Sequence, residues 1–160
     1  MRETMHWVDF ESKKLVDFSK DHVIATGITP SGDIHVGNMR EILTGDALRR
    51  GVSDTGAAAK LIYIGDTIDP LRKVYPFLDD SYGEHVGKPL SEIPCPCGGH
   101  ESYAIHFLTP FLEATRTLGI QAEVLYTHEM YAQGLYAEVS RKVLDNAERI
   151  KEILCVHQQL

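Results

Sequence analysis

One stretch near the N-terminus constrains the fold most, because an apolar run, a glycine-rich turn and a helix start follow one another there. The run at 22–25, rich in β-branched residues, predicts a buried strand that Gly27 ends. Pro30 and Gly32 have the chemistry of a tight turn, and an apolar stripe after the capping residue Asn38 predicts a helix. Free N–H groups and the dipole at such a helix start favour an anion such as a triphosphate.

Two residues between the turn and the helix fit this interpretation. The imidazole of His35 can donate to phosphate oxygens, and Gly37 lets a nucleotide approach the backbone. A single histidine is more often structural, so the argument depends on the ordered string Thr29-Pro30-Ser31-Gly32-x-x-His35-Val36-Gly37-Asn38. This string resembles the His-x-Gly-His/Asn signature of class I aminoacyl-tRNA synthetases and related nucleotidylyltransferases. It is neither a dinucleotide Gly-x-Gly-x-x-Gly fingerprint nor a Walker P-loop.

Length and charge narrow the class of protein. A chain of 160 residues predicts one domain with a real core. The net charge of -7 argues against an extended RNA-binding surface, so any RNA contact is local or lies on a part not present. Three observations predict a cytoplasmic protein without membrane contact. Acidic residues lie near the start, no apolar run has membrane-spanning length, and the three cysteines form no even disulfide framework.

The rest of the chain alternates between helical and strand patterns. Two strands joined by a helix imply a right-handed parallel crossover, with ligands outside the carboxyl ends of the strands. Pro110 is expected to kink or divide its helix. The predicted elements are helices at 7–20, 101–118 and 131–157, strands at 60–65 and 121–126, a loop at 51–56 and a long connection at 75–100.

Charged residues follow the second strand. Asp66 or Asp69 can contact a substrate amine or a ribose hydroxyl, while Arg72 or Lys73 can contact phosphate. Loops are generally polar and exposed, so an ordinary solvated loop is the alternative. The residues alone do not choose between these interpretations.

A Cys95-x-Cys97-x-x-His100 cluster lies in the long connection. These side chains supply three soft ligands for zinc, but the fourth ligand has no obvious local source and the spacing is not that of a usual finger. The prediction is therefore no metal, with a turn-rich loop and free thiols.

Ordered motifs run over most of the chain, at 5–7, 25–32, 35–41, 69–74, 87–94 and 100–107. With these motifs the sequence resembles the N-terminal part of an archaeal-type class I lysyl-tRNA synthetase. This resemblance implies an α/β, parallel-sheet, Rossmann-like (HUP-type) half of the catalytic domain. Residues 1–160 are then a single incomplete nucleotide-binding domain, without the C-terminal half, its Lys-Met-Ser-Lys-Ser-type loop and the anticodon-binding domain.

The resemblance also implies an activity: ATP-dependent activation of lysine to lysyl-adenylate, then transfer to tRNA(Lys). His35 and Asn38 are the expected catalytic residues, and Mg²⁺ is expected with ATP. The carboxylate of Glu41 is expected to bind the substrate ammonium, although it can instead stabilise the first helical turn. The implied ATP-binding residues are Pro30, Ser31, His35, Gly37 and Asn38, and the implied lysine-binding residues are Gly27, Thr29 and Glu41.

The implied partners are ATP, L-lysine and tRNA(Lys), the last mainly through the missing parts. A complementing C-terminal half or self-association is also expected, because an open sheet edge invites pairing. The sequence departs from the family after the second strand, where it has Asp66-Thr67-Ile68-Asp69 instead of consecutive aspartates followed by an aromatic residue. It also departs at Gly99, where a cysteine is usual. A non-catalytic ATP- or lysine-binding module or remnant and a small nucleotidylyltransferase are the alternative functions.

Overall fold

The computed structural model describes residues 5–157. Residues 1–4 and 158–160 lie outside this range, and with them the expectation that the final helix lacks a stop signal at Gln159 and Leu160. The chain divides into two compact units, one up to Thr127 and one from His128 onward. Each unit is described by itself.

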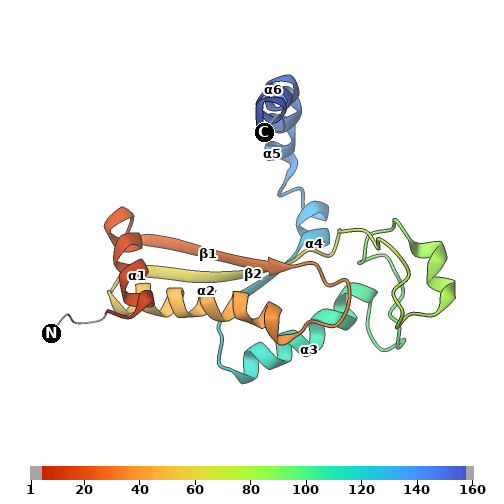
Figure 1. Ribbon diagram of the computed structural model, residues 1–160, viewed down its shortest axis with the longest axis horizontal. Helices are drawn as coiled ribbons and strands as arrows, with labels where there is room; N and C mark the ends of the chain where they lie inside the picture. The colour runs from red at the N-terminus through yellow and green to blue at the C-terminus, as the bar shows by residue number, and fades with distance from the viewer. Residues whose placement is uncertain (1–4, 158–160) are drawn as a thin grey trace. The chain divides into compact units, whose positions relative to one another are not determined.

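The first unit is built on a three-stranded parallel sheet (Figure 1). Its strands are β1 (Asp21–Ile28), β2 (Ala58–Gly65) and β3 (Glu123–Tyr126), in the order β1-β2-β3. Gly27 pairs with Ile64 in the β1–β2 register. The predicted α/β class with parallel strands is therefore confirmed, although β1 continues one residue past Gly27.

Helix α2 (Val36–Asp54) carries the chain from β1 to β2. The predicted loop at 51–56 is wrong, because α2 continues through Gly51. At this position α2 packs against α1 (Trp7–Phe18), and a Cβ on Gly51 would collide with the side chains of Val8 and Ser12. Glycine there permits close helix packing and does not break the helix. The helix ends at Asp54, Thr55 is its C-cap, and Gly56 follows with φ +86°.

The main core lies between the sheet and two helices, α2 and α3 (Tyr103–Thr117), which lie on the same side of the strands in Figure 1. Leu61 and Tyr63 of β2 pack against Ile42 of α2 and Phe111 of α3, and the Tyr63 and Phe111 ring centroids are 5.0 Å apart. Pro110 does not divide α3, which is one helix of 15 residues.

The long connection between β2 and α3 has a small core of its own. It contains the 3-10 helix η1 (Asp80–His85) and an isolated antiparallel bridge between Pro70 and Pro89. Its buried residues pack against the first turns of α3, so apolar burial holds this segment in place. Leu71, Leu90 and Ile93 of the connection form one cluster with Tyr103, Ala104 and Phe107 of α3.

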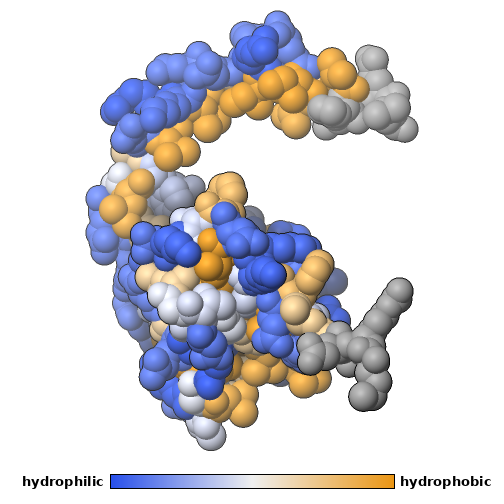
Figure 2. Space-filling model, turned by 90° about the vertical axis from the view of Figure 1, so that its left-hand side faces the viewer, coloured by the Kyte–Doolittle hydropathy of each residue, from blue (hydrophilic) through white to orange (hydrophobic). Residues whose placement is uncertain are grey.

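The second unit contains most of α4 (Thr127–Ala132), then α5 (Ala137–Asp145) and α6 (Ala147–His157). The predicted single helix over 131–157 is wrong, since Gly134, with φ +73°, and Asn146 separate three short helices. Figure 2 shows α5 and α6 with a hydrophilic side and an apolar side. The exposed apolar residues include Leu135, Val139, Val143, Leu144, Ile153, Leu154 and Val156.

No helix within residues 5–157 combines the length and the apolar character that crossing a bilayer requires.

Replacing Gly27 with alanine is expected to destabilise the first unit by about 1–3 kcal/mol. A Cβ there would lie 2.5 Å from the Ile64 carbonyl oxygen, a backbone atom that moves only with the sheet. Gly83→Ala is the matched control, because its Cβ would meet only Val74 Cγ2 at 4.0 Å. Urea unfolding of both variants measures the difference, and equal midpoints would contradict the expectation.

Candidate functional site

The turn between β1 and α2 forms one wall of a cleft of about 490 Å³ at the carboxyl end of the sheet. Ligand sites of open parallel sheets lie at this edge. An aromatic pair forms another part of the lining: the rings of Tyr75 and Phe77 are stacked, with centroids 5.5 Å apart and planes at 5°. The lining residues are Ile28, Thr29, Ser31, Gly32, Asp33, Ile34, His35, Asn38, Tyr75 and Phe77.

His35 is the N-cap of α2, and not Asn38 as the sequence predicted. Its Nδ1 accepts a hydrogen bond from Gly37 N–H at 3.0 Å, and Asn38 Oδ1 accepts one from His35 N–H at 3.3 Å. A Cβ on Gly37 would lie 2.8 Å from the imidazole, so glycine is required for this cap. Because Nδ1 of the exposed ring is occupied as an acceptor, Nε2 is the ring nitrogen that can donate to a ligand.

A second cleft, of about 570 Å³, lies between β1 and α2. Glu41 and Asn38 line it, and Glu41 Oε1 accepts a long hydrogen bond of 3.4 Å from Gly27 N–H. Asn38 also lines the first cleft, so the two clefts share this residue. Burial, and then the negative charge of Glu41, raise the pKa of Tyr63 above its ordinary value.

The structure therefore sorts the predicted site residues into two adjoining groups. Thr29, Ser31 and His35 line the first cleft, Gly37 and Glu41 line the second, and Asn38 lines both. Gly27 joins the second group through its hydrogen bond to Glu41. Pro30 is buried and lines neither cleft, so its expected contact with ATP has no geometric support.

The charged residues after β2 have structural partners. Thr127 Oγ1 donates to Asp66 Oδ1 at 3.1 Å and accepts from Thr67 N–H at 2.9 Å, which ties the end of β2 to the end of β3. Arg72 pairs with Asp69 at 3.1 Å. None of these side chains lines either cleft, which favours the structural interpretation of this loop.

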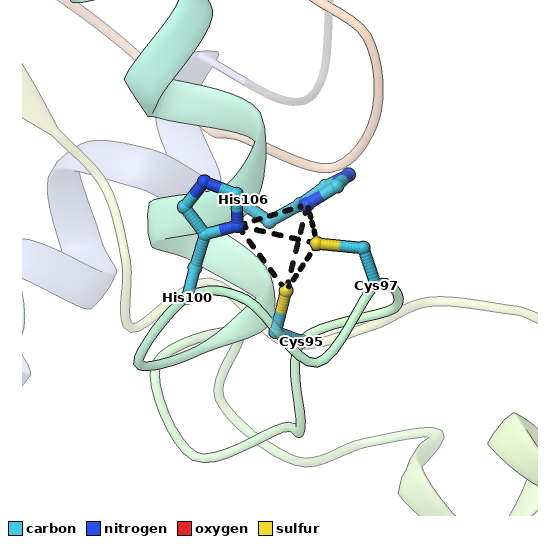
Figure 3. A group of neighbouring side chains, drawn as sticks. All are labelled: Cys95, Cys97, His100 and His106. Atoms are coloured by element: carbon cyan, nitrogen blue, oxygen red, sulfur yellow. Dashed lines mark hydrogen bonds between the residues drawn. The ribbon is translucent and has the colours of Figure 1, made fainter.

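The loop after η1 brings four soft ligands together (Figure 3). Cys95, Cys97 and His100 come from the loop, and His106 comes from the first turns of α3. The expectation that no fourth ligand lies near is therefore wrong. The signal in the sequence was His106 itself, which α3 carries back toward the loop after the N-cap Ser102.

The distances within this group fit a tetrahedral metal site. Cys95 Sγ and Cys97 Sγ are 3.3 Å apart, the two Nδ1 atoms are 3.3 Å apart, and the four sulfur–nitrogen distances are 3.3–3.5 Å. A tetrahedron with Zn–N and Zn–S bonds has edges of about 3.3 to 3.8 Å. Four protein ligands leave no open position, which is typical of a structural site.

The electrostatics of the group favour a metal-binding thiolate. Burial disfavours the charged form of Cys95, but hydrogen bonds from Cys97 and His100 outweigh it and lower the pKa of Cys95 to about 6. A deprotonated thiol is the form that binds metal.

A family model described as "tRNA synthetases class I (K)" matches residues 5–159. The chain belongs to this synthetase family. The family explains the parallel-sheet half with its carboxyl-end cleft, and the resemblance inferred from the motifs is confirmed.

Relatives within this family carry the name lysine–tRNA ligase. The chain is 57% identical to lysine–tRNA ligase 1 of Methanosarcina acetivorans, over 94% of this chain and 28% of the relative. It is 55% identical to the Methanosarcina barkeri (strain Fusaro) ligase, over 96% and 29%, and 51% identical to that of Methanocaldococcus jannaschii, over 94% and 29%. It thus spans under a third of the length of these relatives and corresponds to their N-terminal part.

Proposed function

We propose that this chain is the ATP- and lysine-binding N-terminal part of a class I lysine–tRNA ligase. The observation that carries the proposal is the cap of α2. It holds His35 with its Nε2 available as a donor, beside Asn38, in a cleft at the carboxyl end of the sheet. Further along the same helix, Glu41 lines the second cleft.

The proposed chemistry is activation of an amino acid. A carboxylate oxygen of lysine attacks the α-phosphorus of ATP, the bond to the bridging oxygen breaks, and pyrophosphate leaves. His35 Nε2–H, the Asn38 amide and the N–H groups of the helix start stabilise the phosphate charge, because fixed donors need no reorganisation during the reaction. Mg²⁺ is expected with the phosphates. A terminal tRNA hydroxyl then attacks the lysyl carbonyl, and AMP leaves.

Lysine is placed in the second cleft. The 3.4 Å bond from Gly27 to Glu41 is long, so the carboxylate can take the substrate ammonium as a stronger partner. Thr29 lines the first cleft, in which the lysine carboxylate is expected to meet ATP. This arrangement separates recognition of the side chain from the reacting centre.

Glu41→Gln is expected to raise the KM for lysine about 10- to 100-fold and to leave the KM for ATP within about twofold, since a hydrogen bond between charged groups contributes about 1.5–3 kcal/mol. The measurement is steady-state pyrophosphate exchange at varied lysine and varied ATP. Glu92→Gln, in an exposed loop, is the control. An unchanged KM for lysine in Glu41→Gln would assign Glu41 to helix stabilisation alone.

We also propose that Cys95, Cys97, His100 and His106 bind zinc. The fit of all six ligand–ligand distances to a tetrahedron supports this. When bound, zinc would cross-link the loop to α3 as a structural centre. None of the steps described above is assigned to this zinc.

The remaining partners follow from the length of the relatives. In the described sheet β1 is an edge strand, whereas in a doubly wound fold the first strand is central. We expect a strand from the rest of a full-length ligase to pair with β1, and the apolar side of α5 and α6 to be covered by the same polypeptide. Residues 1–160 are then one incomplete catalytic domain. Contact with tRNA(Lys) is mainly through other domains, and the site of action is the cytoplasm.

The test is lysine-dependent ATP–pyrophosphate exchange in the presence of tRNA. It compares the chain alone with a hybrid enzyme, in which the chain replaces the N-terminal part of the Methanosarcina acetivorans relative. Exchange by the hybrid supports the proposal. A folded hybrid without exchange contradicts it; binding of ATP or lysine without turnover would then indicate a non-catalytic module.

A further inference from the structure

We propose that Tyr103 is a positioning residue that orients the Ser31–Gly32 peptide for binding phosphate in the first cleft. The identity of the ligand rests on the proposed function. The role of Tyr103 rests on contacts between α3 and the turn, which lie 72 positions apart in the sequence.

The first step is the hydrogen bond itself. Tyr103 is fully buried, and its hydroxyl donates to the Ser31 carbonyl oxygen at 2.7 Å. Burial, with the nearby Tyr75, Tyr82 and Asp33, raises the pKa of Tyr103 above its ordinary value, so the hydroxyl keeps its proton. The donor is therefore permanent at physiological pH.

The second step is the orientation of the peptide. The C=O and N–H of a trans peptide point in opposite directions, and the described residues contain no cis peptide. With its C=O held by Tyr103, the Ser31–Gly32 peptide directs the Gly32 N–H away from α3. Within residues 5–157 this N–H has no hydrogen-bond partner, and Gly32 lines the first cleft. It is therefore available to an anionic ligand.

The third step is a second contact between the same helix and the same turn. Phe107 lies one turn after Tyr103, with ring centroids 4.8 Å apart, and it packs edge-on against Phe77 at 5.6 Å. A Cβ on Gly32 would lie 3.2 Å from Phe77 Cζ, so the aromatic ring packs directly against the turn. The hydrogen bond from Tyr103 and the packing of Phe77 against the turn together fix the peptide from two directions.

The helix that carries Tyr103 is itself anchored. His100 and His106 of the four-ligand group flank Tyr103 in sequence, and the Tyr103 N–H donates to the Ile93 carbonyl at 2.8 Å. The first turn of α3 is thus held to the loop on both sides of Tyr103. This anchoring makes the tyrosine a fixed reference for the turn.

The test uses inorganic tripolyphosphate as the probe and the full chain, followed by ¹⁵N–¹H spectra. In the unsubstituted chain the probe is expected to shift the Gly32 amide resonance. Tyr103→Phe removes only the hydroxyl and is expected to weaken binding about 5- to 10-fold. It is also expected to move the Gly32 resonance in the free protein, a readout that a loss of stability alone would not give.

Tyr82→Phe is the matched control, because the Tyr82 hydroxyl also donates to a loop carbonyl, that of Pro94, at 3.1 Å. It is expected to leave tripolyphosphate binding within about twofold. Equal binding by Tyr103→Phe and the unsubstituted chain, an equal loss in Tyr82→Phe, or a Gly32 amide that the probe does not shift would each overturn the inference. A failed exchange assay with intact tripolyphosphate binding would instead contradict the proposed function.

Discussion

His35→Asn is expected to lower lysine-dependent pyrophosphate exchange by the hybrid enzyme about 10²- to 10³-fold, the cost of one fixed donor to a charged transition state. Asparagine is a favourable N-cap, so this variant can replace the bond from Gly37 N–H to Nδ1 while it removes the Nε2 donor. The thermal midpoint is expected to change little. The measurement is kcat for exchange, with circular dichroism to check the fold.

Two further variants separate catalysis from capping. His35→Ala removes both the donor and the cap, and is expected to lose the same activity and in addition about 1 kcal/mol of stability. His22→Gln changes a histidine at the opposite end of β1, where Nε2 contacts the Ser19 carbonyl at 3.0 Å, and is expected to keep its activity. If His35→Asn exchanges pyrophosphate at the unsubstituted rate, His35 is only a helix cap.

Cys97→Ser is expected to abolish stoichiometric zinc binding and to lower the thermal midpoint by on the order of 10 °C. The reason is that three ligands and a hydroxyl bind zinc far more weakly, so the link between the loop and α3 is lost. A loss of about 3 kcal/mol corresponds to this shift in a chain of this size. Metal analysis after gel filtration and thermal unfolding give the two measurements.

Cys155→Ser is the control for this prediction, since Cys155 is an exposed thiol of α6 outside the four-ligand group. It is expected to keep about one zinc per chain and an unchanged midpoint. A chelator is expected to lower the midpoint of the unsubstituted chain and of Cys155→Ser, but not of Cys97→Ser. Zinc-free protein with the full midpoint would contradict a structural metal.

Local patterns predicted most of the first unit. The strand, turn and helix around His35 were predictable because each depends on neighbours within a few residues: β-branched side chains, a proline and glycine turn, and a 3.6-residue stripe. The helix breaks were less predictable. Gly51 interrupts no helix because α1 packs against it, whereas Gly134, with φ +73°, does end one.

The candidate site, too, was predictable only where it depends on residues that are close in the sequence. His35, the N-cap of α2, is followed at three-residue intervals by Asn38 and Glu41, so their proximity is a consequence of helical spacing that the sequence contains. The fold alone places three other residues at the site or in contact with its neighbouring loop: Tyr75, Phe77 and Thr127. They come from a long connection and from the end of β3, and no short sequence pattern predicts contacts between residues so far apart in the sequence.

The sequence by itself determined the chemistry of the turn and the family to which the chain belongs, since both depend on short ordered motifs. The tertiary structure alone decided that His106 completes a four-ligand group and that Tyr103 holds the Ser31 carbonyl. The physical reason is burial: apolar residues of the long connection pack onto the first turns of α3, and this packing brings distant polar groups within bonding distance.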